Sequence, residues 1–265
     1  MSAKGKLVLR GVVGVLLLAT LVFWAYEASE NPSNQLFGKT VVSGPGDQKI
    51  VALTYDDGPN PPFTTSILQV LRREHVHATF FLVGRAVAAY PGVVRQEVRD
   101  GNAVGNHTWD HAHLLVLNPA QLRSTLSRTD QAIFAASGVH SHLMRPPYGA
   151  RDWMVLNEAR KLGYTPVMWS VPLAKDWEYP SASVIAKRIL AHVGDGSIIV
   201  LHDGNLGLLC AREHLAKHIC DRRSDIGATR LIVESLKGQG YRFVTIPQLL
   251  AEHGKATHRP GPGAE

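Results

Sequence analysis

The sequence predicts a parallel α/β fold with about seven strand–helix units, a number that favours a barrel over an open sheet. Three observations lead to this prediction. The chain has 265 residues, 45% of them hydrophobic and 19% charged, which fits one large globular domain. Seven short β-branched or aromatic runs alternate with seven amphipathic stretches. Polar groups directly follow several of these runs, at strand ends where barrels form active sites.

The expected elements alternate regularly along the chain. Short runs rich in β-branched and aromatic residues predict strands at residues 50–54, 78–83, 103–106, 143–145, 165–169, 197–201 and 243–246. Apolar residues recurring every three or four positions predict helices at residues 64–74, 92–100, 119–136, 152–162, 183–193, 228–240 and 247–253. Because a helix follows each strand, we expect the strands to run parallel.

The N-terminus carries a targeting segment. Lys4, Lys6 and Arg10 precede an uncharged apolar run over residues 11–26, which Glu27 ends. Sixteen residues are short for a membrane span, but Arg10 can snorkel to the headgroups and lengthen it. We favour an uncleaved signal anchor over a cleaved signal peptide, with the basic flank inside. A buried core helix is a weaker alternative because the run is apolar on all sides.

Composition divides the chain into four parts. These are a signal anchor or signal peptide (1–28), a turn-rich linker (29–48), a folded domain (49–253) and a flexible tail rich in glycine and proline (254–265). The net charge of +6 comes from scattered basic residues without interleaved aromatics, so we expect no nucleic-acid partner. A basic exterior suits anionic lipids or an anionic cell wall.

Two adjacent carboxylates follow the first expected strand. Asp56 and Asp57 precede a Gly58-Pro59 turn. Because neighbouring carboxylates repel each other, a divalent cation bound by one of them would compensate and leave the other free as a base. The alternative is an aspartate-rich turn with its side chains in solvent.

Two histidines follow the third expected strand. If His107 and His111 lie on one helical turn, both imidazoles face the same way and reach a single ion. A pair at this spacing also arises easily by chance among thirteen histidines. Together with an aspartate, however, the pair forms the ligand set of a catalytic zinc or similar ion, with positions left for water and substrate.

Three further groups follow later strands. Arg145 begins an Arg-Pro-Pro-Tyr-Gly turn, where it can hold an aspartate by a charge-assisted hydrogen bond, and a backbone N–H of that turn can face an oxyanion. His202 ends the sixth expected strand and has the pKa range of a general acid. Asp176 can raise that pKa, and Trp177 can form an apolar wall. Each group also fits an ordinary loop or rim position.

Together these residues resemble the polysaccharide deacetylases of carbohydrate esterase family 4, also called the NodB homology domain, over about residues 50–250. The resemblance lies in five ordered motifs: Thr54-Tyr55-Asp56-Asp57-Gly58-Pro59, Asn106-His107-Thr108-Trp109-Asp110-His111, Arg145-Pro146-Pro147-Tyr148, Asp176-Trp177 and Val200-Leu201-His202. The first three are specific in combination. The resemblance implies a distorted (β/α) barrel with fewer than eight units, which agrees with the seven expected strands.

The resemblance also implies a role for each matched residue. Asp57, His107 and His111 would bind a divalent metal, with Zn²⁺ favoured over Co²⁺ or another ion. Asp56 would be the general base and His202 the general acid, with Asp176 beside it. Arg145 would orient Asp56, and the backbone N–H of Tyr148 would stabilise the oxyanion. The expected substrate groove contains Trp177, Pro147 and Trp109.

The resemblance implies deacetylation of a glycan outside the cytoplasmic membrane. The favoured substrates are N-acetylglucosamine polymers such as peptidoglycan or a chitin-like glycan. Acetylated xylan and exopolysaccharide are the less favoured alternatives. We expect a monomeric catalytic domain that is held at the membrane or, if the N-terminal segment is cleaved, secreted. The rivals are a non-catalytic glycan-binding relative and hydrolysis of a small amide or a lipid-linked sugar.

Three positions leave alternatives open. Family members commonly carry an acid three residues after the tryptophan that matches Trp169, but Pro172 stands here, so either Asp176 alone supports His202 or the groove is altered. Cys210 and Cys220 either form a disulfide that closes a loop or remain free thiols. We interpret His113, His140 and His142 as surface or rim histidines. Their spacing does not set them apart.

Overall fold

The computed structural model describes residues 3–209 and 217–257. Its strands form one seven-stranded sheet in the order β5-β4-β3-β2-β1-β6, with β7 beside β1, and every pair of strands is parallel. The strands are β1 (Ile50–Asp56), β2 (Thr79–Leu82), β3 (Ala103–Asn106), β4 (Leu143–Met144), β5 (Thr165–Pro166), β6 (Ser197–His202) and β7 (Arg242–Phe243). All seven expected strands are therefore confirmed.

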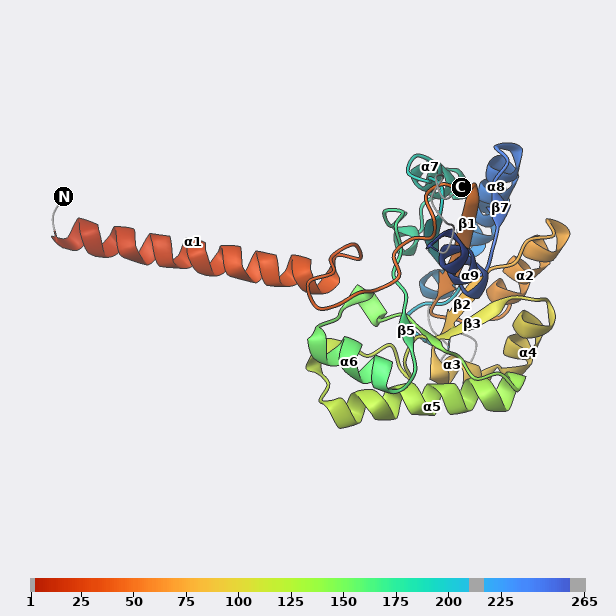
Figure 1. Ribbon diagram of the computed structural model, residues 1–265, viewed down its shortest axis with the longest axis horizontal. Coiled ribbons are helices and arrows are strands. Elements are labelled where there is room, and N and C mark those ends of the chain that lie inside the picture. Colours follow the sequence, from red (N-terminus) through yellow and green to blue (C-terminus); the bar gives the residue numbers. More distant parts are fainter. Residues whose placement is uncertain (1–2, 210–216, 258–265) are drawn as a thin grey trace, which may run out of the picture.

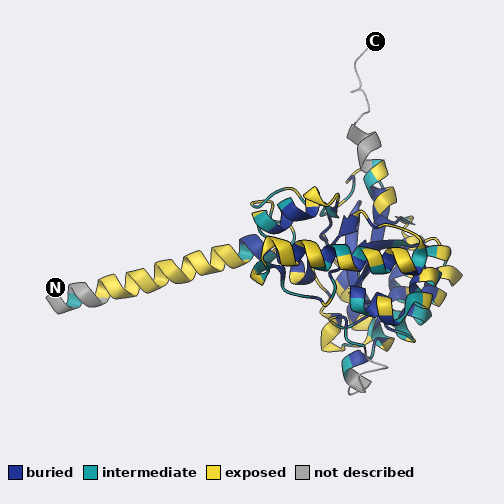
Figure 2. Cartoon of the chain, turned by 90° about the horizontal axis from the view of Figure 1, so that it is seen from below, coloured by how far each residue is buried: buried dark blue, intermediate teal, exposed yellow. Residues whose placement is uncertain are grey.

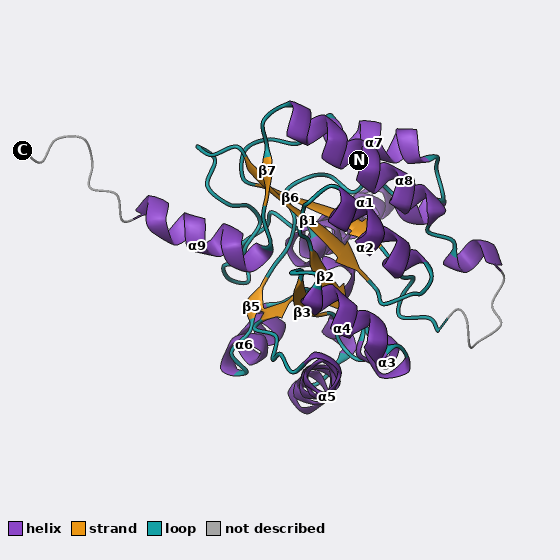
Figure 3. Ribbon diagram, turned by 90° about the vertical axis from the view of Figure 1, so that its right-hand side faces the viewer, coloured by secondary structure: helices purple, strands orange, loops and turns teal. Residues whose placement is uncertain are grey.

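Helices surround this sheet (Figures 1 and 3), with α7 and α8 on one side and α5 and α6 on the opposite side. The helices are α1 (Ala3–Glu30), α2 (Phe63–Arg73), α3 (Gly84–Ala89), α4 (Pro91–Arg99), α5 (Pro119–Ser137), α6 (Trp153–Lys161), α7 (Ala182–Leu190), α8 (Arg223–Gly238) and α9 (Ile246–Thr257). Their ends follow local chemistry. Asn118 and Gln121 form a capping box at the start of α5, and Gly138 ends that helix in the left-handed conformation.

The sheet curls into a distorted barrel that has no strand ladder between β5 and β6. The chain around residues 41–43 bridges this interval: Val41 pairs with Val167 beyond β5, and Ser43 pairs with Ser197 in β6. The backbone of Ser170 also donates a hydrogen bond to the Ile198 carbonyl at 3.2 Å. The predicted parallel α/β barrel is thus confirmed in its distorted form.

Alternation along β1 orients the residues that matter for function. Val51, Leu53 and Tyr55 belong to the core beneath the helices, whereas Ile50 and Ala52 belong to a second core on the opposite face. Because side chains alternate along a strand, Thr54 and Asp56 share the face of Ile50 and Ala52. The strand is buried throughout. The carboxylate at its end is therefore held on the inner side of the barrel.

Two local predictions differ from the structure. The short helix α3 was not expected, since six residues are too few to show a clear period. Residues 107–111 were expected to form a helical turn but form a loop, in which Thr108 and His111 have φ values of 66° and 58°. The prediction that the two histidines share one helical turn is therefore wrong, although the loop still brings them together.

The segment predicted to be a linker, residues 29–48, lies against the domain. Besides the two bridges at Val41 and Ser43, Arg160 donates a hydrogen bond to the Lys39 carbonyl at 2.5 Å, and Gly44 N–H bonds the Gly196 carbonyl at 2.7 Å. These partners are far apart in sequence. A turn-rich composition predicts an irregular backbone but says nothing about what that backbone contacts.

Helix α1 extends away from the domain as a long rod (Figure 1) and is exposed along almost all of the length described (Figure 2). Within the described residues, Leu9–Glu30 forms the one helix long and apolar enough to cross a membrane, and its most apolar 18 residues, with a mean hydropathy of 1.9, are not buried. Only its C-terminal turn contacts the domain, where Ala28 and Ser29 are buried. The apolar N-terminal segment is thus a helix whose last turn joins the fold.

Candidate active site

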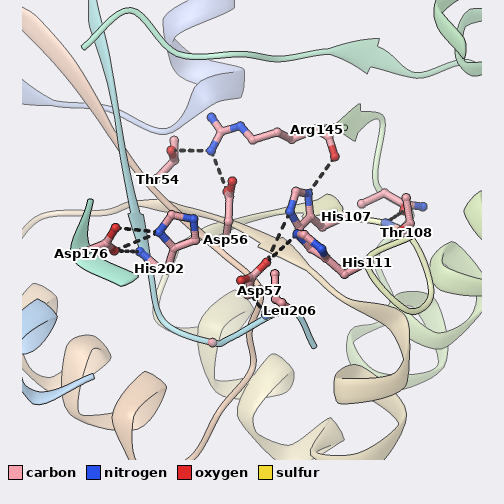
Figure 4. Close-up of polar contacts among 12 residues, drawn as sticks. Thr54, Asp56, Asp57, His107, Thr108, His111, Arg145, Asp176, His202 and Leu206 are labelled. Atoms are coloured by element: carbon pink, nitrogen blue, oxygen red, sulfur yellow. Dashed lines mark hydrogen bonds and ion pairs between the residues drawn. The ribbon is translucent and has the colours of Figure 1, made fainter. Parts of the chain in front are cut away.

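A cavity of about 580 Å³ opens at the carboxyl ends of the strands. Nine of the eleven predicted site residues form or adjoin it. Asp56 and Asp57 come from the end of β1, His107 and His111 from the loop after β3, and His202 from the end of β6. Parallel strands bring these positions to one edge of the sheet, as expected for a barrel. Figure 4 shows how these side chains point toward one another.

Three of these side chains form a candidate metal site. One ligand atom each from Asp57, His107 and His111 lies within 4.8 Å of the others, and all three residues are buried. Asp57 Oδ1 lies 3.1 Å from His111 Nε2 and 3.5 Å from His107 Nε2. One carboxylate and two imidazoles are the donor set of catalytic zinc sites.

Hydrogen bonding at this triad fits a cation. His107 Nδ1 lies 2.7 Å from the Arg145 carbonyl, so Nδ1 donates and Nε2 presents its lone pair to Asp57. Asp57 Oδ1 is buried without a hydrogen-bond donor. Unprotonated acceptors that face one another in a buried site require a positive charge between them.

One further contact fixes Asp57. Its second oxygen, Oδ2, accepts a hydrogen bond from the backbone N–H of Leu206 at 2.7 Å. Burial raises the pKa of Asp57, but positive charge at His111 outweighs burial and lowers this pKa well below its ordinary value; a cation bound between the carboxylate and the neutral imidazoles would supply that charge. The carboxylate is therefore ionised, as a metal ligand must be.

Asp56 is held by a buried arginine. Arg145 Nη1 donates to Asp56 Oδ1 at 2.7 Å and to Thr54 Oγ1 at 2.8 Å. Its other nitrogens donate to the backbone carbonyls of Val167 and Met168, and its guanidinium lies over the Phe81 ring. Both members of the ion pair are buried. The predicted geometry, in which Arg145 orients Asp56, is present in the structure.

His202 pairs with Asp176 across the cavity from the metal triad. The imidazole Nδ1 lies 2.9 Å from Asp176 Oδ2, and the backbone N–H of His202 donates to the same oxygen at 2.8 Å. Burial lowers the pKa of His202, but the Asp176 charge outweighs burial and raises this pKa to about 9. The imidazole is thus protonated at neutral pH, with Nε2 left free on a side chain that lines the cavity.

Two buried groups support Asp176 from behind. Burial, followed by the Asp176 charge, raises the pKa of Asp225 well above its ordinary value. Arg222 donates to the Gly204 carbonyl at 2.7 Å and adds a positive charge. His202 therefore interacts with an acid held in a larger buried network, and Asp176 makes this contact without a side chain from the Pro172 position.

The backbone around the cavity is unusual. Asp57, His111 and Tyr148 are non-glycine residues with φ values of 78°, 58° and 60°. Such left-handed conformations cost free energy and persist where the surrounding structure holds them, often at functional sites. The Tyr148 ring in turn packs edge-on against His111, with ring centroids 4.6 Å apart.

Of the three residues predicted for the substrate groove, one lines the cavity. Trp177 lines the cavity and lies edge-on to His202. Pro147 does not line it, because its neighbour Pro146 takes that place. Trp109 does not line it either. Its ring packs close to Gly84 and beneath the Arg128 guanidinium, which lies 3.6 Å from the ring centroid.

Sequence reasoning missed several residues of the site. Thr54 could have been found, because it lies two positions before Asp56 on the same face of a strand. The Leu206 backbone contact and the cavity positions of Tyr26 and Glu30 depend on the tertiary fold. No spacing in the sequence signals them.

The cysteines lie beside this region. Cys220 is buried and disulfide-bonded, so the alternative of a free thiol is wrong for this residue. Cys210 lies outside the described residues.

The fold and the site together define a class: an α/β barrel with a candidate Asp-His-His metal centre, an arginine-bound aspartate and an aspartate-bound histidine at its strand ends. Comparison with known proteins is more specific. A family model described as polysaccharide deacetylase matches residues 43–167. A peptidoglycan-N-acetylglucosamine deacetylase from Bacillus cereus is 34% identical over 208 residues, which are 78% of this chain and 90% of that relative. The chain belongs to the polysaccharide deacetylase family.

Two other similar proteins show that family membership alone does not establish the activity of this chain. The peptidoglycan-N-acetylglucosamine deacetylase PgdA of Listeria monocytogenes is 35% identical over 204 residues, but these cover 77% of this chain and only 39% of the relative. The structure of BA3943, a family 4 pseudoenzyme from Bacillus anthracis, is 27% identical with a TM-score of 0.71, covering 81% and 69% of the two chains. Fold alone therefore does not establish catalysis. Catalytic activity has to be inferred from the side chains of the site.

Proposed function

We propose that the chain is a metal-dependent hydrolase that removes acetyl groups from N-acetylglucosamine residues of a glycan. One observation carries the proposal: a candidate metal triad, an arginine-held aspartate and an aspartate-held histidine border the same cavity. A non-catalytic binding protein has no need of all three. The relatives named as deacetylases of peptidoglycan N-acetylglucosamine support the substrate class.

The proposed chemistry is addition of water to the acetyl carbonyl. Asp56 takes a proton from the water as the water oxygen attacks the carbonyl carbon. When the resulting tetrahedral intermediate collapses, the carbon–nitrogen bond breaks and His202 gives its proton to the departing nitrogen. Acetate and a free amine are the products. The backbone N–H of Tyr148 is our candidate donor to the oxyanion.

A divalent cation held by Asp57, His107 and His111 would polarise the carbonyl and lower the pKa of water. We propose zinc, since two imidazoles and one carboxylate with further positions open are typical of catalytic zinc. Arg145 acts as a positioning residue, because its contact is with Asp56 through a single nitrogen while the rest of its guanidinium is tied to the backbone.

We further propose that residues 1–28 remain as an uncleaved membrane anchor and that 49–253 form the catalytic domain on the outer side. An exposed apolar helix of suitable length supports the anchor. The buried contacts of Ala28 and Ser29 with the domain support its retention, because cleavage near this position would cut a segment that belongs to the fold.

Replacing Asp56 by Asn tests the assigned base. Asn still accepts a hydrogen bond from Arg145 but takes no proton, so acetate release should fall by about 10²- to 10⁴-fold, whereas the zinc content of the purified protein should stay the same. Asp110, an exposed carboxylate in the loop of the histidine ligands, is the matched control. Asp110→Asn should keep its rate. An Asp56→Asn variant with full turnover would remove Asp56 as the base.

A further inference from the structure

The last turn of α1 is fastened to the catalytic domain by one buried arginine. Arg151 is 1% exposed, and its guanidinium donates to the backbone carbonyls of Ser29, Asn31, Pro32 and Asn34 at 3.4, 2.7, 3.3 and 2.6 Å. A cation at a helix C-terminus also interacts favourably with the helix dipole. Because the contact begins at Ser29, no free chain separates the apolar helix from the domain.

The same helical turn borders the proposed active site. Tyr26 and Glu30 line the cavity together with Asp56 and His202. Glu30 Oε1 lies 3.4 Å from His113 Nε2, and the His113 ring stacks on Tyr148, which packs on the ligand His111. A continuous series of contacts therefore joins the end of α1 to the candidate metal site.

A second hollow, of about 540 Å³, continues the cavity along the end of α1. The two share Tyr26, Glu30, Tyr148, Trp169 and Leu173. Beyond these shared residues the hollow reaches Pro172, the position where the family resemblance implies an acid. An uncharged side chain there makes this part of the groove less polar than the resemblance predicts.

The position of α1 fixes where the cavity lies relative to a bilayer. The uncharged run over residues 11–26 is about 24 Å long as a helix, and Glu30 lies only about 6 Å beyond it. Trp24 and Tyr26 are exposed aromatics at the end of this run, as in the aromatic belts of membrane helices. With α1 in a membrane, the part of the cavity lined by Tyr26 and Glu30 would lie at the level of the lipid headgroups.

The surface beside the end of α1 is also suited to the lipid headgroup layer. Leu36, just after the segment bound by Arg151, is 73% exposed, and Trp153, two residues after Arg151, is 67% exposed. Large apolar side chains with this exposure beside a membrane helix fit the headgroup region, where aromatic rings have an apolar and a polar environment.

We infer that the preferred substrate is a glycan carried by a membrane lipid: its acetylated sugar enters the cavity, and its lipid-bearing end lies in the hollow beside α1. This inference rests on the proposed deacetylase function and adds that the substrate is attached to a membrane lipid. A helix docked without slack keeps the cavity at the bilayer surface, where a lipid-linked glycan presents its first sugars. The chemistry is unchanged: water and the acetamide yield acetate and the amine.

The test uses the full chain reconstituted in vesicles of phosphatidylethanolamine and phosphatidylglycerol. Two probes are compared: chitotetraose joined at its reducing end to a twenty-carbon isoprenyl chain, and free chitotetraose. We expect acetate release from the lipid-linked probe with at least a tenfold higher kcat/KM. Equal rates, or faster release from the free glycan, overturn the inference but leave the deacetylase function intact. Release from neither probe contradicts the proposed function itself.

Anchoring enzyme and probe in one membrane raises the rate by proximity alone, so a second variant isolates the docked geometry. Ten Gly/Ser residues inserted between Glu27 and Ala28 keep the anchor but let the cavity leave the surface. The ratio of the two rates should fall severalfold. The same insertion between Gly46 and Asp47, an exposed turn after the docked segment, should leave the ratio unchanged. If the first insertion also leaves the ratio unchanged, the docked helix does not select the substrate.

Discussion

At the scale of single residues, the backbone gives two adjacent aspartates different surroundings. Asp56 is the last residue of β1 and points to the inner face of the barrel, where Arg145 holds it. Asp57 has a φ of 78° and meets the two histidines. The sequence predicted that one aspartate would bind a cation and leave the other free, because adjacent carboxylates repel. It could not predict the left-handed turn that separates them.

The pair formed by His202 and Asp176 makes a prediction about pH. A general acid must be protonated, so activity should fall as pH rises through about 9, the raised pKa of His202. In Asp176→Asn, burial still lowers this pKa and the largest opposing charge is gone, while Asp57 and Asp56 still raise it. The alkaline limb of the kcat/KM profile should therefore move to a lower pH than in the parent. An unmoved limb would contradict the role of Asp176.

The same pair also makes the stability of the fold depend on pH. The pKa of His202 is raised on folding, so its contribution is complete below about pH 6.5 and is lost as pH rises through about 9. Burial raises the pKa of Asp176, but His202 outweighs burial and lowers it to about 2. That contribution is present above about pH 4 and is lost as pH falls through about 2. Thermal unfolding of Asp176→Asn should differ most from the parent between these limits.

At the scale of elements, the strands were predictable because buried strands are rich in β-branched and aromatic residues. All seven appear where β-branched and aromatic runs predicted them. The loops at their ends were not predictable in detail. Residues 107–111 have histidines at helical spacing but a non-helical backbone, since contacts with the rest of the site, such as that of His107 with the Arg145 carbonyl, fix the loop instead.

Close packing between the ends of β1 and β6 makes a testable prediction. A Cβ on Gly204 would lie 2.2 Å from the Asp57 carbonyl oxygen, so Gly204→Ala must shift the backbone of a proposed metal ligand. Zinc affinity, measured by competition with a chromophoric chelator, should fall by about 10- to 100-fold although every ligand remains. Gly194, whose Cβ would meet nothing within 4 Å, is the control. Equal zinc affinity in the two alanine variants would show that this contact does not position Asp57.

At the scale of the whole molecule, the apolar helix α1 and the barrel share one contact region. The sequence predicted an apolar targeting segment and then a linker, because composition reports hydropathy and turn tendency. It could not predict that Arg151, more than a hundred residues away, binds the carbonyls that follow α1. Pairings at such separations depend on the completed fold.

This contact predicts that the anchor is retained. When the full chain is expressed in its host with a C-terminal tag, the product should keep its N-terminal residues by mass spectrometry and should stay in the membrane fraction after alkaline carbonate washing. A mature N-terminus between residues 23 and 32, with the protein in the soluble fraction, would instead establish a cleaved signal peptide.

Metal-assisted hydrolysis of an acetamide at this site is tested by acetate release from N-acetylglucosamine oligosaccharides. Release by the full chain is measured before chelation, after chelation and after zinc is restored. We predict release that chelation abolishes and zinc recovers. A rate that chelation leaves unchanged would contradict the metal mechanism, and no release under any condition is what a non-catalytic glycan-binding relative would give.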